Sequence, residues 1–422
     1  MRKSRKCIAG VLWAALLTFA AGVAHAKVDY LCLKGGSVID PALRTMKRTD
    51  LIIRGNLIDE LRRSGATATP CQGRTIDISG AFVVPGFVDT HVHAWGNPSP
   101  VKEANDEEWG DEGTAERVLQ TGVVAFLSMS SEAEDLLLRD RLRGSSRHAQ
   151  MVIAAPTFPG ASGAKQARDR IAAMVKTGAD LIKLFAGGAQ MGVMLQEARR
   201  FNKKTVVHIA NWEQGRQAVK GGATAITHLE DEAVIPNDLV QEMAKRNTIS
   251  IPTMAVQCDL ASFANNKTPA WWSDPLLQLV TGDVLRADYR HANDFSGHAI
   301  RTIRWQAAGC RTNDFASIKR LREGRVNILA GSDTGNVGTF QGFSLHREME
   351  LLVEAGLSTW EALEAGTSAG AAFLSLPFGV TPGAEASIVV LEKSPIDDIR
   401  NTRLIRHVIH HGQLLRPLPL AR

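Results

Sequence analysis

The most constraining feature of the sequence is the alternation of short apolar stretches with longer amphipathic ones through most of the chain. Eight stretches have the length and composition of buried β-strands, at residues 81–93, 122–129, 150–156, 180–185, 205–210, 224–229, 249–254 and 327–333. Segments between and after them carry apolar residues at helical spacing, among them 211–222, 236–247 and 346–356. Eight strands that alternate with helices predict a closed (β/α)₈ TIM barrel.

The two ends of the chain have a different pattern. Residues 28–81 and those from 377 onward consist of short strand-like stretches and turns, without a sustained helical period. We expect both ends to join into one small β-sandwich beside the barrel, which makes the fold class α/β. The expected domains are 27–82 with 377–422 for the β-sandwich and 83–376 for the barrel.

The first 26 residues have the three parts of a secretory signal peptide. Four Lys or Arg residues come first, an apolar stretch follows from Ile8, and the segment ends in the small-x-small sequence Ala24-His25-Ala26. Cleavage is expected before Lys27, which would place the mature protein in the periplasm or outside the cell. A membrane anchor is the alternative, although the apolar stretch is short and is interrupted by Gly and Thr.

Charge argues against two classes of partner. The net charge of the whole chain is +5, and removal of the four basic residues of the signal segment leaves +1. The mature part has no basic run, so we expect neither a nucleic-acid partner nor a membrane surface after signal cleavage. A homo-oligomer is compatible with the sequence.

Four cysteines remain after the signal segment, an even number in an oxidising compartment. Three pairings are possible. Cys32 and Cys71 both fall in the N-terminal strand-rich part, which favours a disulfide between them and leaves Cys258 and Cys310 as the other pair. Four free buried thiols are the alternative.

Polar residues suited to metal binding gather where the predicted barrel strands end, which is the active face of such barrels. They are His91, His93, Lys183, His208, His228 and Asp333. Imidazole and carboxylate groups are usual ligands of zinc, iron or manganese. Lys183 is an unusual member, because an ammonium repels a metal. If burial lowers its pKa, the neutral amine can add carbon dioxide and become a negatively charged carbamate.

Several motifs, in this order, resemble the amidohydrolase superfamily, nearest to its imidazolonepropionase-like and prolidase-like branch. They are "PGFVDTHVHA", "GADLIKLF", "TVVHIA", "GGATAITHLEDEA" and "ILAGSDTG". The resemblance implies a metal-dependent hydrolase that cleaves a C–N bond of a small molecule with a metal-bridging hydroxide. It also implies two divalent ions, with zinc expected.

The resemblance assigns a role to each residue. His91, His93 and Asp333 would bind one ion, and His208 and His228 the other. Carbamylated Lys183 would bridge the two ions. Asp333 would also be the catalytic residue that accepts and then delivers a proton.

The sequence also departs from the prolidase-like pattern. The segment after the third strand, "PTFPGASGAKQ", lacks a histidine that those members carry, and no tyrosine lies between Tyr30 and Tyr289. A clamp for a peptide carboxylate like theirs is therefore not expected. Substrate identity stays open among amides, cyclic amides and N-acyl amino acids or dipeptide-like compounds.

Other functions use the same residues differently. A mononuclear deaminase on this scaffold is the main alternative, although only Glu213 follows the fifth-strand histidine as its proton carrier. A class I aldolase would use Lys183 but leave the histidines unexplained. A non-catalytic metal-binding barrel is the third alternative. Four tryptophans near strand ends could line a pocket or pack the barrel: Trp95, Trp212, Trp271 and Trp272.

Overall fold

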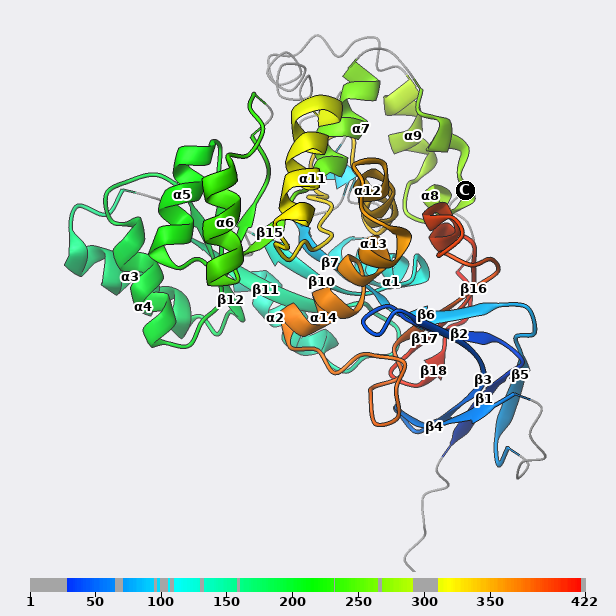
Figure 1. Ribbon diagram of the computed structural model, residues 1–422. Helices are drawn as coiled ribbons and strands as arrows, with labels where there is room; N and C mark the ends of the chain where they lie inside the picture. Colours follow the sequence, from blue (N-terminus) through cyan, green and yellow to red (C-terminus); the bar gives the residue numbers. More distant parts are fainter. Residues whose placement is uncertain are drawn as a thin grey trace, which may run out of the picture.

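The computed structural model describes residues 29–64, 71–94, 97–98, 105–106, 110–129, 133–157, 160–230, 232–264, 268–290 and 310–418. The predicted signal peptide, residues 1–26, lies outside the described residues. Within them, seven parallel strands form a nearly closed barrel (Figure 1). In spatial order they are β7 (Phe87–Val92), β10 (Val123–Met129), β11 (Gln150–Thr157), β12 (Leu181–Phe185), β13 (Thr205–His208), β14 (Ala225–Thr227) and β15 (Ile249–Ile251).

The predicted eighth strand closes the barrel in a different form from the one expected. The described structure has no regular strand at 327–333. A single parallel bridge joins Ile328 to Ser250 of β15, and another joins Thr334, the residue after the segment, to Val92 of β7. The backbone at Asp333 has φ 54°, which an extended strand does not allow. The barrel is nevertheless an α/β TIM-type barrel, as the sequence predicted.

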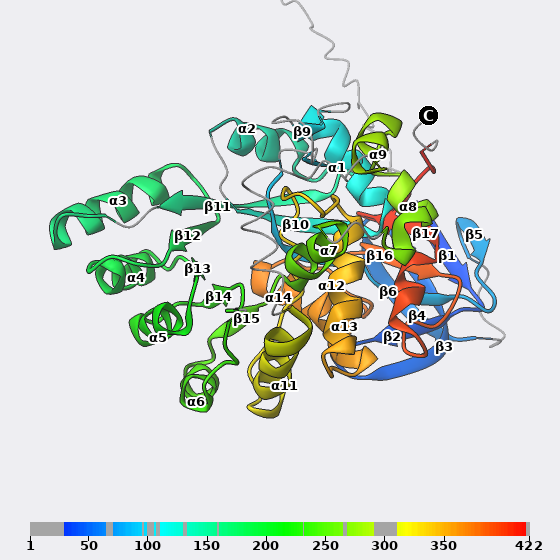
Figure 2. The ribbon, with the colours of Figure 1, turned by 90° about the horizontal axis from the view of Figure 1, so that it is seen from above.

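Helices cover the outside of the parallel strands, as Figure 2 shows for α3 to α6. The helices along the barrel are α1 (Gly110–Gln120), α2 (Ala133–Leu142), α3 (Ala164–Lys176), α4 (Met191–Arg200), α5 (Trp212–Gly221), α6 (Asn237–Arg246), α7 (Met254–Ala264), α8 (Pro275–Gln278), α9 (Asp283–Arg290), α11 (Phe315–Glu323), α12 (Phe343–Glu354), α13 (Thr359–Ala365) and α14 (Ser368–Leu374). Shorter elements are β8 (Asn97–Pro98), β9 (Asn105–Asp106), η1 (Ala270–Ser273), η4 (Cys310–Asp314) and η5 (Ile399–Arg403).

Local sequence signals set several helix ends. The Asn211 side chain accepts a hydrogen bond from Gln214 N at the start of α5, and Gly222 ends that helix with φ 87°. Ser358 and Glu361 form a reciprocal capping box at the start of α13. The ends of α5 lie where the sequence predicted them, because caps depend on residues only a few positions apart.

The first predicted strand divides between the two parts of the molecule. Its first half is β6 (Phe82–Pro85), which pairs with β16 outside the barrel, and its second half is β7. Gly86 lies at the crossing, where its N–H donates to Ser387 O at 2.8 Å. A Cβ at Gly86 would come within 2.4 Å of Val124 Cγ2, so a larger residue would not fit at this junction.

The chain ends share one mixed, curled sheet that packs beside the barrel (Figure 1). Its strands are β1 (Tyr30–Lys34), β2 (Ser37–Asp40), β3 (Thr45–Arg54), β4 (Leu57–Arg63), β5 (Arg74–Asp77), β6, β16 (Ile388–Leu391), β17 (Ile405–His410) and β18 (Gln413–Leu414). Its apolar core includes Leu33 and Ile53 from the first part of the chain and Ile388 and Ile409 from the last. The β-sandwich built from both ends is therefore confirmed.

Both cysteine pairs are bonded. Cys32 of β1 is joined to Cys71, and Cys258 of α7 is joined to Cys310 of η4. The first disulfide closes a separation of 39 residues around the mixed sheet, and the second closes 52 residues beside the barrel. The predicted Cys32–Cys71 pair is confirmed. Among the described helices, none is long and apolar enough to cross a membrane.

Peptide mapping without reductant should recover both cross-linked pairs, and neither should react with an alkylating agent in the folded protein. Replacing Cys32 and Cys71 together by Ala should lower the free energy of unfolding by about 2–4 kcal/mol, because the unfolded chain regains the freedom that the cross-link removes. Rapid alkylation of Cys32 and Cys71 in folded, unreduced protein would contradict the pairing.

Candidate metal centre

Five of the six predicted residues lie at the carboxyl ends of the barrel strands, and Lys183 comes from within a strand. His91 lies in β7 and His93 just after it, Lys183 is in the middle of β12, and His208 is the last residue of β13. His228 follows β14, and Asp333 lies in the closing segment. Neighbouring parallel strands bring their carboxyl ends together, so residues far apart in the chain meet here.

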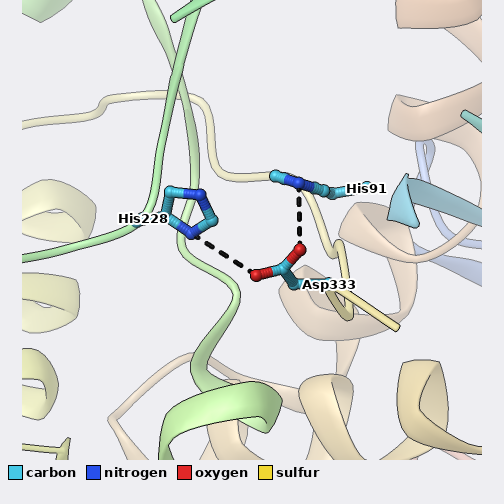
Figure 3. Close-up of side chains that lie close together, drawn as sticks. All are labelled: His91, His228 and Asp333. Carbon is cyan, nitrogen blue, oxygen red and sulfur yellow. Dashed lines mark ion pairs between the residues drawn. The ribbon is translucent and has the colours of Figure 1, made fainter. Parts of the chain in front are cut away.

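The centre of the site is the Asp333 carboxylate (Figure 3). Its Oδ1 lies 3.1 Å from His91 Nε2 and 3.1 Å from His93 Nε2, and its Oδ2 lies 3.9 Å from His228 Nδ1. His91, His228 and Asp333 each offer a ligand atom, and these atoms lie within 4.8 Å of one another. Among the described residues, Asp333 Oδ1 has no partner in hydrogen-bonding geometry, although it is buried.

Lys183 and His208 complete the group. Lys183 Nζ lies 3.5 Å from His91 Nε2, and the side chain is 1% exposed. The His208 ring packs against the His228 ring with centroids 4.3 Å apart. Phe185, two residues beyond Lys183 on β12, places its ring 5.1 Å from the His208 ring.

Two threonines decide which nitrogen of each histidine carries a proton. Thr227 Oγ1 donates its one proton to Ile251 O at 3.1 Å, so it can only accept from His91 Nδ1, 2.7 Å away. Thr253 Oγ1 likewise donates to Pro252 O and accepts from His228 Nδ1, at 2.7 Å each. Both histidines therefore carry the proton on Nδ1, and their Nε2 lone pairs are left for a ligand.

A buried aspartate connects the histidine strand to the closing segment. Asp89 Oδ1 accepts from Ser332 N at 2.9 Å and from His91 N at 3.2 Å, and its Oδ2 accepts from Ser332 Oγ at 2.6 Å. Gly331 lets the two segments approach closely, since a Cβ there would lie 2.8 Å from His91 Cβ. Asp89 thus holds the backbone of His91 and of Ser332, the residue before Asp333, with one carboxyl group.

The backbone of the site is strained. His228, Thr253 and Asp333 have φ of 73°, 56° and 54°, in the left-handed region that residues other than glycine seldom adopt. This is least common for a β-branched residue such as Thr253. Such strain persists only where surrounding contacts hold it, and it collects at functional sites.

Burial and nearby charge keep the imidazoles of His91, His208 and His228 neutral. Burial, with the nearby charge of Lys183, lowers the pKa of His91 to about 3 and that of His208 to about 4, and burial beside His208 lowers the pKa of His228 well below its ordinary value. Burial also lowers the pKa of Lys183 to about 7 against the opposing charge of Asp333.

These donors fit a divalent metal ion. Two hydrogen-bond acceptors, His91 Nε2 and Asp333 Oδ1, lie 3.1 Å apart in a buried space. Lys183 Nζ is 3.5 Å from this Nε2, whereas Oδ1 has no hydrogen-bond partner among the described residues. That arrangement is unfavourable unless a cation lies between them. Neutral imidazole and ionised carboxylate are also the forms that bind zinc and similar ions.

Sequence reasoning did not identify the residues that orient the ligands. Asp89, Thr227 and Thr253 each lie within four residues of a predicted strand end, and each is buried. The detectable signal was Asp89, an acidic residue in an otherwise apolar strand. The threonines carry no such signal, because threonine is common in strands.

Other predicted residues lie away from the centre. Trp212 is buried in the barrel core and donates from Nε1 to Ala233 O, and Trp271 and Trp272 pack into a separate aromatic cluster with Phe340. These three tryptophans pack the protein, which was one of the two expectations, and Trp95 lies outside the described residues. Glu213, the proton carrier that a deaminase would need, is exposed on α5.

Comparisons with known proteins agree with this geometry. Residues 82–415 match the amidohydrolase family. A solved Xaa-Pro dipeptidase with bound methionine is 18% identical and aligns over 92% of this chain and 100% of its own, with a TM-score of 0.76. Molinate hydrolase is also 18% identical, over 92% of this chain and 95% of its own, with a TM-score of 0.69. At such identities the likeness shows the fold.

Curated relatives match over short stretches. A dihydroorotase from Trichlorobacter lovleyi is 41% identical over 63 residues, which is 15% of this chain and 14% of that enzyme. An allantoinase from Deinococcus radiodurans is 32% identical over 119 residues, or 28% of this chain and 24% of its own. The chain thus spans about a quarter or less of the length of these relatives. Because the family match covers well over half of the chain, the protein belongs to the amidohydrolase family of metal-dependent hydrolases.

Proposed function

We propose that the protein is an exported binuclear amidohydrolase that cleaves a C–N bond in an amide, a cyclic amide, or an N-acyl amino acid or dipeptide-like substrate. The observation that carries this proposal is the contact between the unprotonated Nε2 of His91 and the Asp333 carboxylate. Around this contact are more donors than one catalytic zinc ion takes: four histidines, one aspartate and one buried lysine.

In this proposal His91, His93 and Asp333 hold one ion, and His208 and His228 hold the other. Divalent ions, zinc being the expected metal, would supply a water of lowered pKa and polarise the scissile carbonyl. The Asp333 carboxylate would accept the proton of the attacking water and deliver it to the leaving nitrogen.

Lys183 would bridge the ions as a carbamate. Because burial lowers its pKa to about 7, much of the amine is neutral and nucleophilic near neutral pH. Its nitrogen would attack the carbon of carbon dioxide, form an N–C bond and lose a proton to solvent. The product carries a negative charge, which removes the cost of burying an ammonium ion beside two cations.

A mononuclear deaminase is less well supported. Its proton carrier would have to be Glu213, yet this side chain is exposed on α5 and accepts a hydrogen bond from Gln217 Nε2. A non-catalytic metal-binding barrel would hydrolyse no amide or cyclic amide, so measurable hydrolysis of either excludes it. A deaminase would release ammonia from an amidine-type ring, whereas an amidohydrolase would release an amine and an acid.

Relatives are named dihydroorotase, allantoinase and D-aminoacylase, and structural neighbours are named Xaa-Pro dipeptidase and molinate hydrolase. A screen of the purified, zinc-loaded protein against N-acyl amino acids, dipeptides, lactams and lactones tests the proposal directly. Hydrolysis of at least one C–N bond is expected, and turnover confined to ring deamination would support the alternative.

Export can be tested by mass. Protein recovered from the periplasm or the medium of an expressing Gram-negative cell should begin at Lys27, because cleavage follows Ala26. Intact mass and N-terminal sequencing give the answer. Recovery of full-length protein in the membrane fraction would instead support an uncleaved anchor.

Replacing Asp333 by Asn should leave a folded protein whose turnover falls by roughly 10²–10⁴-fold, because the amide cannot accept the proton. Metal content must be measured with the rate, since Asp333 is also a proposed ligand. Asp238→Asn is the matched control, because this carboxylate is exposed on α6 and paired with Arg216. Near-normal turnover in Asp333→Asn would exclude the proton-transfer role.

Replacing Lys183 by Ala should remove about one metal ion per chain and most of the activity, and added bicarbonate or a short carboxylate should restore part of both. Lys204→Ala is the control, since Lys204 lies just before β13 and binds Ser375 Oγ at 3.0 Å. Elemental analysis and intact mass give the readout. One metal per wild-type chain, with an unmodified lysine, would overturn the bridge in favour of a mononuclear site.

A further inference from the structure

Helix α7 begins directly after Thr253, whose side chain already serves His228. The first N–H groups of a helix have no partner within it, and a Ser, Thr, Asp or Asn just before the helix usually accepts from one of them. Thr253 is in that position and is of that residue type. Its hydroxyl, however, donates to Pro252 O and accepts from His228 Nδ1. Within the described part of the chain it accepts from none of the first N–H groups of α7, so its side chain does not cap its own helix.

The missing acceptor comes from another helix. Glu348 of α12 reaches the start of α7, and its Oε2 accepts from Ala255 N at 2.7 Å. The two helices pack against each other, as Figure 2 shows. Glu348 is 0% exposed, and its Oε1 has no hydrogen-bond partner among the described residues. Burying a carboxyl group with half of its capacity unused is costly, which indicates a specific purpose.

We propose that Glu348 is a positioning residue for the metal centre. By capping α7 it takes the place of Thr253, and Thr253 stays turned toward His228. His228 then keeps its proton on Nδ1 and presents its Nε2 lone pair to the metal. Without Glu348, the Thr253 hydroxyl would rotate to accept from the N–H groups of its own helix, and His228 would lose the partner that orients it.

The strained backbone supports this assignment. Thr253 has φ 56°, whereas a residue that caps a helix with its own side chain usually has extended backbone. The same short segment also supports His91, because Ile251 O accepts from Thr227 Oγ1. Burial raises the pKa of Glu348 to about 8, so a glutamine, which resembles the protonated acid, should be a close substitute.

The inference rests on the proposed metal centre, and its test measures metal binding in the intact protein. Zn²⁺ affinity is measured by competition with a chromophoric chelator in wild type, Glu348→Ala, Glu348→Gln and Thr253→Val. We expect Glu348→Ala and Thr253→Val each to weaken the binding of one ion by roughly 10–100-fold, and Glu348→Gln to stay close to wild type. Glu350→Ala is the control, because it removes an acidic side chain from the same helix that pairs with Arg347 and Arg403.

The double variant separates this role from general destabilisation. If Glu348 acts through Thr253, adding Glu348→Ala to Thr253→Val should weaken Zn²⁺ binding no further. Losses that multiply, or an unchanged affinity in Glu348→Ala, would overturn the inference. If Glu348→Ala does not fold, Glu348→Asp, which shortens the reach, should show the same selective loss of one ion. A wild-type protein that binds no Zn²⁺ would refute the proposed function itself.

Discussion

The site depends on one contact, the approach of a buried carboxylate to imidazole nitrogens that carry no proton. Asp333 Oδ1 and His91 Nε2 are both acceptors, and they lie 3.1 Å apart. Left alone, such groups would separate or take up a proton. Here the Thr227 hydroxyl accepts from His91 Nδ1 and so sets the tautomer of that ring. Asp89 accepts from the backbone N–H groups of His91 and Ser332 and so holds the two segments together. This geometry fits a cation held between the two acceptors.

The segment that closes the barrel is also the segment that carries Asp333 into the site. A regular eighth strand would have paired along its whole length with β7 and β15. Instead, the closing segment keeps single bridges and a few backbone hydrogen bonds to each neighbour, and the bonds between Asp89 and Ser332 add side-chain contacts to β7. This irregular pairing releases Asp333 from extended geometry, so that its side chain turns toward the histidines. A more regular barrel would place this carboxylate elsewhere.

The mixed sheet and the disulfides support the barrel without entering the chemistry. The apolar core of the sheet is distinct from that of the barrel, and Cys32–Cys71 braces it near the chain terminus. Gly86 connects the two parts so closely that β6 and β7 leave it in different sheets. Stability in this region can thus change without moving the ligands. Near the site, a change in packing would move a ligand. Glu348 of α12 caps α7, and in our proposal this cap sets the orientation of His228.

The sequence by itself determined the barrel, the two-ended sheet and the six candidate site residues, because apolar periodicity and strand ends are properties of neighbouring residues. It also indicated that Lys183 is buried, since the lysine lies within "LIKLF". Only the tertiary structure decided which histidine nitrogen is free, why the last strand is irregular and which side chain caps α7. Those answers depend on contacts between residues 136, 243 and 93 positions apart. No local pattern encodes such contacts, because each forms only after the barrel has brought the two partners together.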